Sequence, residues 1–259
     1  MTTSTTGAGL GGEPAGRAAS AVIRSAIPLI PALFAPVAVL IGFWTGGRFL
    51  LPILATLAVY PILAILVLRG RFSLALIASV LWAISLSTTI IAVTAHDPAG
   101  AAEVVLNGPR YRDEMFDYIR TGHGRETEPG LYLPQHLVHL GAFIVLTVLS
   151  GGFLGIALGA VLVGYMSYYV GALAAAGSEP WLAFAIGWPP WAILRVVAYI
   201  MLGVVLARPL LSAVGRRAIP APPAGPWYIT CAALLLLDVV LKGLLAPLWA
   251  VLLRPCLGL

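Results

Sequence analysis

Long apolar runs, separated by short polar or basic segments, dominate the pattern of this chain. A helix needs about 20 apolar residues to cross the hydrocarbon core of a membrane. Six runs approach or exceed that length, at 27–44, 49–68, 72–93, 137–176, 181–207 and 227–245. The pattern therefore predicts an all-α protein, a polytopic bundle of transmembrane helices.

The uncharged run 137–176 is too long for a single span. One helix of its 40 residues would measure roughly 60 Å, about twice the thickness of the hydrocarbon core. The small residues of "SGGFLG" at 150–155 predict a break, so that the run crosses twice. The total is then about seven spans, or six if the proline-rich run 27–44 lies in the membrane interface.

A second break is predicted inside the run 181–207, at "GWPPWAILR". Neither Pro189 nor Pro190 has an N–H to donate, and no water replaces the lost bonds inside a membrane. We therefore expect a helix break at 188–190, a short or re-entrant segment before it, and a true span that starts near Pro190. The tryptophans around the break then form an interfacial aromatic belt: Trp181, Trp188 and Trp191.

The charges between the runs predict an orientation. Basic loops stay in the cytoplasm, and arginines gather in three places: Arg17 and Arg24, Arg69 and Arg71, and Arg208, Arg216 and Arg217. Segment 96–135 instead has seven acids against four arginines. These charges favour a cytoplasmic N-terminus and an exterior loop.

Four regions follow from these spans. Residues 1–20 are mostly Thr, Gly, Ala and Ser, and residues 1–26 are predicted to form a disordered cytoplasmic tail. Three N-terminal transmembrane helices follow at 27–94, then the exterior loop at 95–136. The last region, 137–259, is predicted to be a C-terminal four-helix membrane bundle.

Composition narrows the class of function. The chain is 60% hydrophobic and 10% charged, whereas soluble domains carry about 25% charged residues. The lipid bilayer is therefore the main environment, and no basic, aromatic stripe indicates nucleic-acid binding. Because no HExxH, GxSxG or Walker-type motif occurs, we expect no enzyme and no cofactor. Cys231 and Cys256 are expected to be inert packing residues.

The exterior loop contains one amphipathic helix. Pro109 suits its first turn and Gly122 its end, while Tyr111, Met115 and Ile119 recur every four residues. The apolar stripe is predicted to lie on the membrane surface or to cap the bundle, and the helix to contact a partner outside.

Three histidines are candidate metal ligands. His136 and His139 are three residues apart at a predicted helix start, and His123 precedes them together with the loop carboxylates Glu126 and Glu128. A metal or proton site would use such a set. Interfacial hydrogen bonding is the interpretation that we favour, and a membrane-embedded metal enzyme is the least favoured function.

Glycines recur every four residues at Gly151, Gly155 and Gly159. In lipid, small residues at this spacing let helix backbones approach closely. We favour helix packing, within the chain or against a partner. A substrate path lined by glycine is the alternative.

The charges inside apolar runs are Arg195, Asp238 and Lys242, and such charges are costly in a membrane. Lys242 follows Asp238 by four residues, the order that favours a pair on one helix face. A helix that restarts at Pro190 leaves Arg195 shallow and able to reach the outer surface, whereas a continuous helix would pair it with Asp238. We expect the first. An ion pair that holds two helices together is favoured over a site for an anionic group or a proton.

The last spans resemble the stage II sporulation protein M family of bacterial membrane proteins over roughly residues 137–250. "SGGFLGIALGAVLVGYMSYYVG" resembles the glycine-rich span of that family. "PWAILR" at 190–195 is similar to its P-H-G-x-x-E element, and "LKGLLAP" at 241–247 to its I-E-x-F-x-x-P-like element. In this chain, Arg195 and Lys242 replace the two glutamates. The resemblance implies an α-helical membrane component that works with partner proteins and is not itself a catalyst.

Two functions are consistent with these patterns. The first is a non-catalytic subunit or scaffold of a bacterial inner-membrane complex, an oligomer or hetero-complex with membrane or periplasmic partners. The alternative is a transporter whose site for an anionic substrate or for proton coupling contains Arg195, Asp238 and Lys242.

Overall fold

The computed structural model of the chain describes residues 26–177, 179–216, 218–219 and 224–259. Within these residues the protein is α-helical and contains no strand. Seven of the described helical segments are long and apolar enough to cross a membrane, as the sequence predicts. The tail predicted at 1–26 lies almost entirely outside the described residues, as does Arg217.

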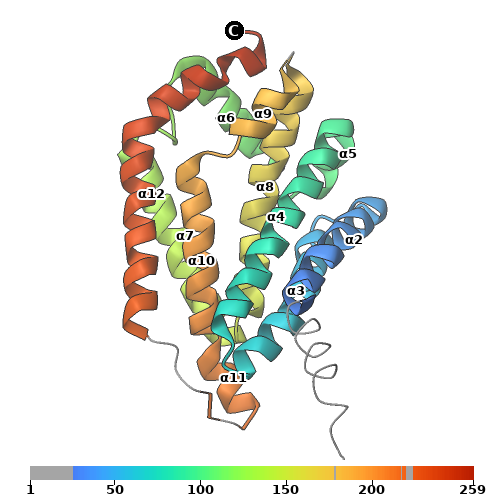
Figure 1. The fold of residues 1–259 in the computed structure, drawn as a ribbon. Helices are drawn as coiled ribbons and strands as arrows, with labels where there is room; N and C mark the ends of the chain where they lie inside the picture. Colours follow the sequence, from blue (N-terminus) through green and yellow to red (C-terminus); the bar gives the residue numbers. More distant parts are fainter. Residues whose placement is uncertain (1–25, 178, 217, 220–223) are drawn as a thin grey trace, which may run out of the picture.

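The helices follow one another along the chain with short connections (Figure 1). Their bounds are η1 (Ile27–Leu29), α2 (Ile30–Thr45), α3 (Leu50–Leu68), α4 (Phe72–His96), α5 (Pro98–Val104), α6 (Gly108–Thr121), α7 (Pro129–Ser150), α8 (Phe153–Ala176), α9 (Pro180–Ile186), α10 (Pro190–Leu206), α11 (Arg208–Val214), α12 (Ala224–Leu253) and η2 (Arg254–Leu257).

Helix α8 lies in the middle of the bundle and joins its two halves. It packs on α3 and α4 on one side and on α6, α7 and α9 on the other. At Gly171 the backbones of α8 and α4 come so close that an added Cβ would lie 2.6 Å from the Ile91 carbonyl oxygen. The N-terminal three helices and the predicted C-terminal four-helix bundle therefore share one core.

The predicted break at 150–155 is confirmed. Gly151 and Gly152 have φ angles of 60° and 99°, a left-handed backbone that glycine adopts without steric cost. They end α7 and turn the chain into α8.

The start of α7 differs from the prediction. It begins at Pro129, so the polar connection ends at Glu128 and not at 136. Proline is favourable in a first helical turn because its φ angle is preset and its missing N–H would have no partner there. The sequence pattern assigned Gln135 and His136 to the loop because they are polar, but both line a cavity inside the bundle.

The predicted break at 188–190 is also confirmed. Helix α9 ends at Ile186, Pro189 is extended with ψ at 142°, and α10 begins at Pro190. The predicted aromatic belt is wrong for Trp191, which is 1% exposed and packs edge-on against Trp249, with ring centroids 5.8 Å apart. Trp188 is also partly buried against the core, while Trp181 is 82% exposed.

Helices α5, α6, α9 and η2 gather at one end of the bundle, opposite α11 (Figure 1); we call this the α6 end. Met115 and Ile119 of the predicted amphipathic stripe are buried, and α6 packs on α8 and α12. The Tyr118 hydroxyl donates to the Ala246 carbonyl of α12. Helix α6 therefore caps the bundle, one of the two predicted placements.

Candidate functional site

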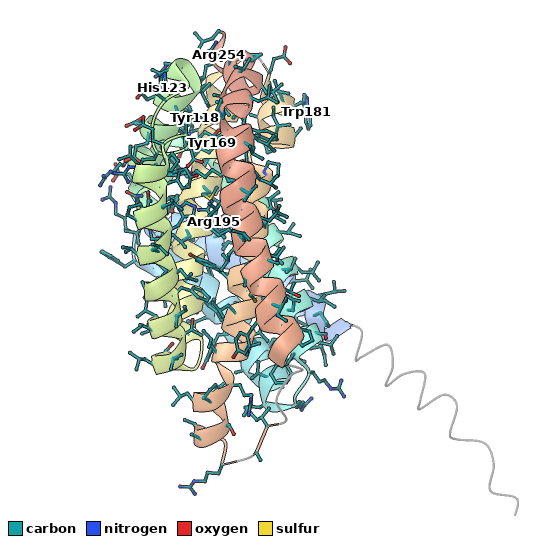
Figure 2. The ribbon with its side chains drawn as sticks, turned by 90° about the vertical axis from the view of Figure 1, so that its left-hand side faces the viewer. Tyr118, His123, Tyr169, Trp181, Arg195 and Arg254 are labelled. Carbon is teal, nitrogen blue, oxygen red and sulfur yellow. The ribbon has the colours of Figure 1, made fainter. Side chains whose placement is uncertain are left out.

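Two of the three predicted intramembrane charges form one ion pair. Arg195 of α10 donates to both carboxylate oxygens of Asp238 on α12, from Nε at 3.0 Å and from a terminal nitrogen at 3.1 Å. The Asp238 side chain is 1% exposed and that of Arg195 is 19% exposed. Figure 2 shows Arg195 between α7 and α12, well below Tyr118 and His123. The expectation that Arg195 reaches toward the surface is wrong, because its guanidinium turns inward to Asp238.

Lys242 is bound by a different carboxylate from the one predicted. Its Nζ lies 3.0 Å from Glu126, which follows α6, and not in an ion pair with Asp238 one turn away. The Lys242 side chain is 2% exposed and that of Glu126 12%. Among the described residues, Asp238 is paired with Arg195 and Lys242 with Glu126. The face of the Tyr132 ring adds a cation–π contact, with Lys242 Nζ 4.7 Å from the centroid.

His136 lies beside the Arg195–Asp238 pair. Its Nδ1 is 2.7 Å from the Tyr132 carbonyl oxygen, which only accepts, so Nδ1 carries the proton. Its Nε2 is buried without a hydrogen-bond partner and lies 3.8 Å from Asp238 Oδ2. We call Glu126, His136, Arg195, Asp238 and Lys242 the charged cluster.

A cavity of about 30 Å³ borders the charged cluster on the side of the loop and α6. Arg125 lies at its rim, 44% exposed and 3.7 Å from Glu114. The lining side chains are mostly polar: Tyr111, Glu114, Met115, Arg125, Glu126, Gln135, His136, His139, Tyr165, Met166, Arg195 and Lys242. The volume is enough for about one water molecule.

Two tyrosines of α6 lie in the interior, and Tyr111 lines this cavity. Burial, and then the charge of Glu126, raise the pKa of Tyr111 well above its usual range. The same two causes raise the pKa of Tyr118. Both shifts favour the neutral phenol, the form in which Tyr118 donates to the Ala246 carbonyl.

The predicted histidine site is not assembled. His123 is exposed at the α6 end, far from the level of Arg195 in Figure 2. His136 and His139 line the cavity. In the part of the chain that the structure describes, no three His, Cys, Asp or Glu side chains converge as metal ligands.

The three predicted packing glycines have three different environments. Gly155 packs against α7, where an added Cβ would overlap Thr147 Oγ1 and lie 3.0 Å from Thr147 Cβ. Gly151 is a turn residue and not part of a helix face. Gly159 faces a separate, apolar cavity of about 60 Å³ and has no atom within 4 Å of an added Cβ. Close helix packing is thus confirmed at Gly155 alone, and it occurs within the chain.

The role of Glu126 is the main feature that sequence reasoning missed. The loop carboxylates were considered only as metal ligands, because nothing in the sequence shows that the segment after α6 folds inward. Tyr132 carries a weak signal, since it lies four residues before His136 and therefore on the same face of α7.

No family model, no curated protein and no solved structure matches the chain. The resemblance to the stage II sporulation protein M family stays a prediction. What the cluster does is therefore argued from its own geometry.

Proposed function

We propose that this integral membrane protein is a transporter, with the charged cluster as its substrate or coupling-ion site. One observation carries the proposal: two ion pairs, contributed by α10, α12 and the segment after α6, are buried between apolar helices beside a polar cavity. Ionisable groups inside membrane helices are expensive and are found where ions or polar substrates bind.

The surroundings of the cluster support this role. Helix α10 begins at the α9–α10 break, only five residues before Arg195, and broken helices are typical of binding sites in transporters. Farther from the α6 end the interior is apolar, with the cavity at Gly159 lined by residues such as Trp82, Phe143 and Leu162. Polar groups at one end and an apolar barrier beyond them suit a site that opens to one side at a time.

We further propose that the α6 end faces the exterior of a bacterial inner membrane. The basic segments at 69–71 and 208–217 lie at the connections that would then be cytoplasmic, and the acidic segment 96–128 lies outside. In this orientation the polar cavity is on the exterior side of the cluster.

The test is charge movement in proteoliposomes on a solid-supported membrane. Solution exchanges would vary pH and then a panel of small organic anions. The wild type is expected to give transient currents, and Asp238→Asn to abolish them at equal amounts of monodisperse protein. Asp113→Asn is the matched control, since Asp113 is 66% exposed and pairs with Arg112 away from the cluster. Currents of wild-type size from Asp238→Asn would contradict the proposal.

A subunit of a membrane complex is the second candidate. Helix α7 favours it, since only 11% of the apolar stretch of this helix is buried within the chain. This is the lowest share among the seven candidate spans of the described residues. The glycine tract gives it less support than the sequence suggested, because Gly155 packs within the chain. A specific protein that co-purifies in mild detergent, and is lost when Leu137 and Leu149 on exposed positions of α7 become Ala, would support it.

A further inference from the structure

The segment after α6 supplies the only ion-pair partner that the structure gives Lys242 in the described part of the chain. A buried ammonium group requires a negative partner, because an uncompensated charge in an apolar interior is strongly destabilising. Asp238 does not meet this need, since its single negative charge is paired with Arg195 and it forms no ion pair with Lys242. Lys242 therefore depends on a side chain that belongs to a loop and not to a membrane helix.

The backbone around Glu126 is suited to a movable segment. Gly122 and Gly124 have φ angles of 77° and 127°, and hinges are often a few such loop positions that absorb large backbone changes. Backbone hydrogen bonds join the two ends of residues 122–128 to α6 and α7, from the Gly122 N–H to the Tyr118 carbonyl at 2.7 Å and from the Leu131 N–H to the Glu128 carbonyl at 2.9 Å. Between these ends, the side chains that reach the helices are Glu126, paired with Lys242, and Arg125, at 3.7 Å from Glu114 and 3.4 Å from Gln135. The 3.0 Å pair is the shortest of these side-chain contacts.

Charge arithmetic then indicates what replaces Glu126. In the structure, the positive charges of Arg195 and Lys242 are balanced by the negative charges of Asp238 and Glu126. When residues 122–128 lift away, one buried positive charge is left at Lys242, next to the Tyr132 ring and the hydroxyl-lined cavity. The ligand that restores neutrality there is a monoanion, and the group already fitted to Lys242 is a carboxylate.

We propose that the charged cluster binds a small monocarboxylate, which takes the place of the Glu126 carboxylate on Lys242 when residues 122–128 lift away. Glu126 is then an internal competitor that closes the site in the absence of ligand. The inference rests on the proposed function in taking the cluster as a ligand site. It adds the class of ligand and the group that the ligand displaces.

The test measures binding and not transport. Propionate has the same three-carbon skeleton as the end of a glutamate side chain, and its binding to the full chain in lipid nanodiscs is followed by ligand-observed NMR. Glu126→Gln removes the competing charge, so we expect propionate to bind at least tenfold more tightly than to the wild type. Lys242→Gln, alone or combined with Glu126→Gln, should abolish saturable binding.

Two controls complete the experiment. Asp113→Asn should bind as the wild type does, and uncharged propionamide should not compete. Equal affinities of wild type and Glu126→Gln, or equal competition by propionamide, would overturn the inference. If Glu126→Gln does not fold, Glu126→Asp weakens the pair and should bind at least threefold more tightly than the wild type; an equal affinity would be just as decisive.

The outcomes separate this inference from the proposed function. Tighter propionate binding to Glu126→Gln without any charge movement would support the binding site and contradict the transporter proposal. Charge movement that depends on Asp238, without binding that depends on Glu126, would do the reverse.

Discussion

At the scale of single residues, the Arg195–Asp238 ion pair shows how two charges are accommodated in an apolar interior. The Asp238 side chain is buried and that of Arg195 is largely buried, and two hydrogen bonds join them. Removing one partner leaves an uncompensated buried charge, whereas removing both leaves an apolar contact. The two kinds of variant should therefore behave very differently.

We predict that Arg195→Met destabilises the protein by about 3–5 kcal/mol, the range for breaking one side of a buried pair. Adding Asp238→Leu to it should recover most of that loss. Thermal unfolding in detergent, arranged as a double-mutant cycle, gives the coupling between the two positions. A double variant no more stable than Arg195→Met would contradict this account.

The same residues show what a sequence reveals about a site. Arg195, Asp238 and Lys242 stand out because each is a charge in an apolar run. Their pairing does not, because it depends on the rotation of α10 and α12 about their axes and on the path of the loop. Lys242 illustrates the limit: spacing along one helix favoured Asp238, but a carboxylate from a distant segment reached it.

At the scale of helices, close packing of α7 on α8 depends on one glycine of the tract. Gly155→Ala should destabilise the protein by about 1–3 kcal/mol, because the added methyl group overlaps Thr147. Gly159→Ala is the matched control on the same helix. Its methyl group meets no neighbour within 4 Å, so the gain in helix propensity should leave stability unchanged or raise it by up to about 1 kcal/mol.

Thermal unfolding of the two alanine variants, as folded monomers, makes the comparison. Equal effects at both positions would mean that the α7–α8 contact is not as close as described. Loss of a partner protein from Gly155→Ala without loss of monomer stability would instead favour packing between chains.

Helix breaks were more predictable than helix starts. The turns at 151–152 and 187–189 follow from glycine and proline, which change the backbone wherever they occur. The start of α7 was placed too late because Gln135 and His136 are polar, and polarity alone does not distinguish a loop from an inward-facing site. The short helix α5 was missed, although Asp97 and Pro98 form a typical helix start in which Asp97 accepts from the Gly100 N–H at 2.9 Å.

At the scale of the whole molecule, the direction in which the bundle crosses the membrane determines which side has access to the cluster. We predict that His123→Cys at the α6 end is labelled by a membrane-impermeant maleimide in intact cells. Arg216→Cys, beyond α11, should react only after permeabilisation. Cys231 and Cys256 are buried, so the wild type provides a low background. The reverse labelling pattern would place the cavity on the cytoplasmic side.

The seven candidate spans of the described chain were predictable from the lengths of the apolar runs, because the thickness of a membrane fixes the length of a span. The arrangement of those spans was not. Helix α8 packs on both α4 and α7, so the division of the chain at residue 137 has no counterpart in the core. Which helices meet is decided by side-chain shape, as at Gly171 and Gly155. The periodicity of apolar residues does not indicate which face of a helix packs when most faces are apolar.

The central claim is that the charged cluster acts on ions and does not merely hold helices together. Charge movement by the Arg195→Met/Asp238→Leu double variant tests it most directly, because this variant is expected to fold while lacking the buried pair. The account predicts a stable, monodisperse protein that gives no transient current under conditions in which the wild type does. Currents of wild-type size from the double variant would show that the pair is only structural and would contradict the account.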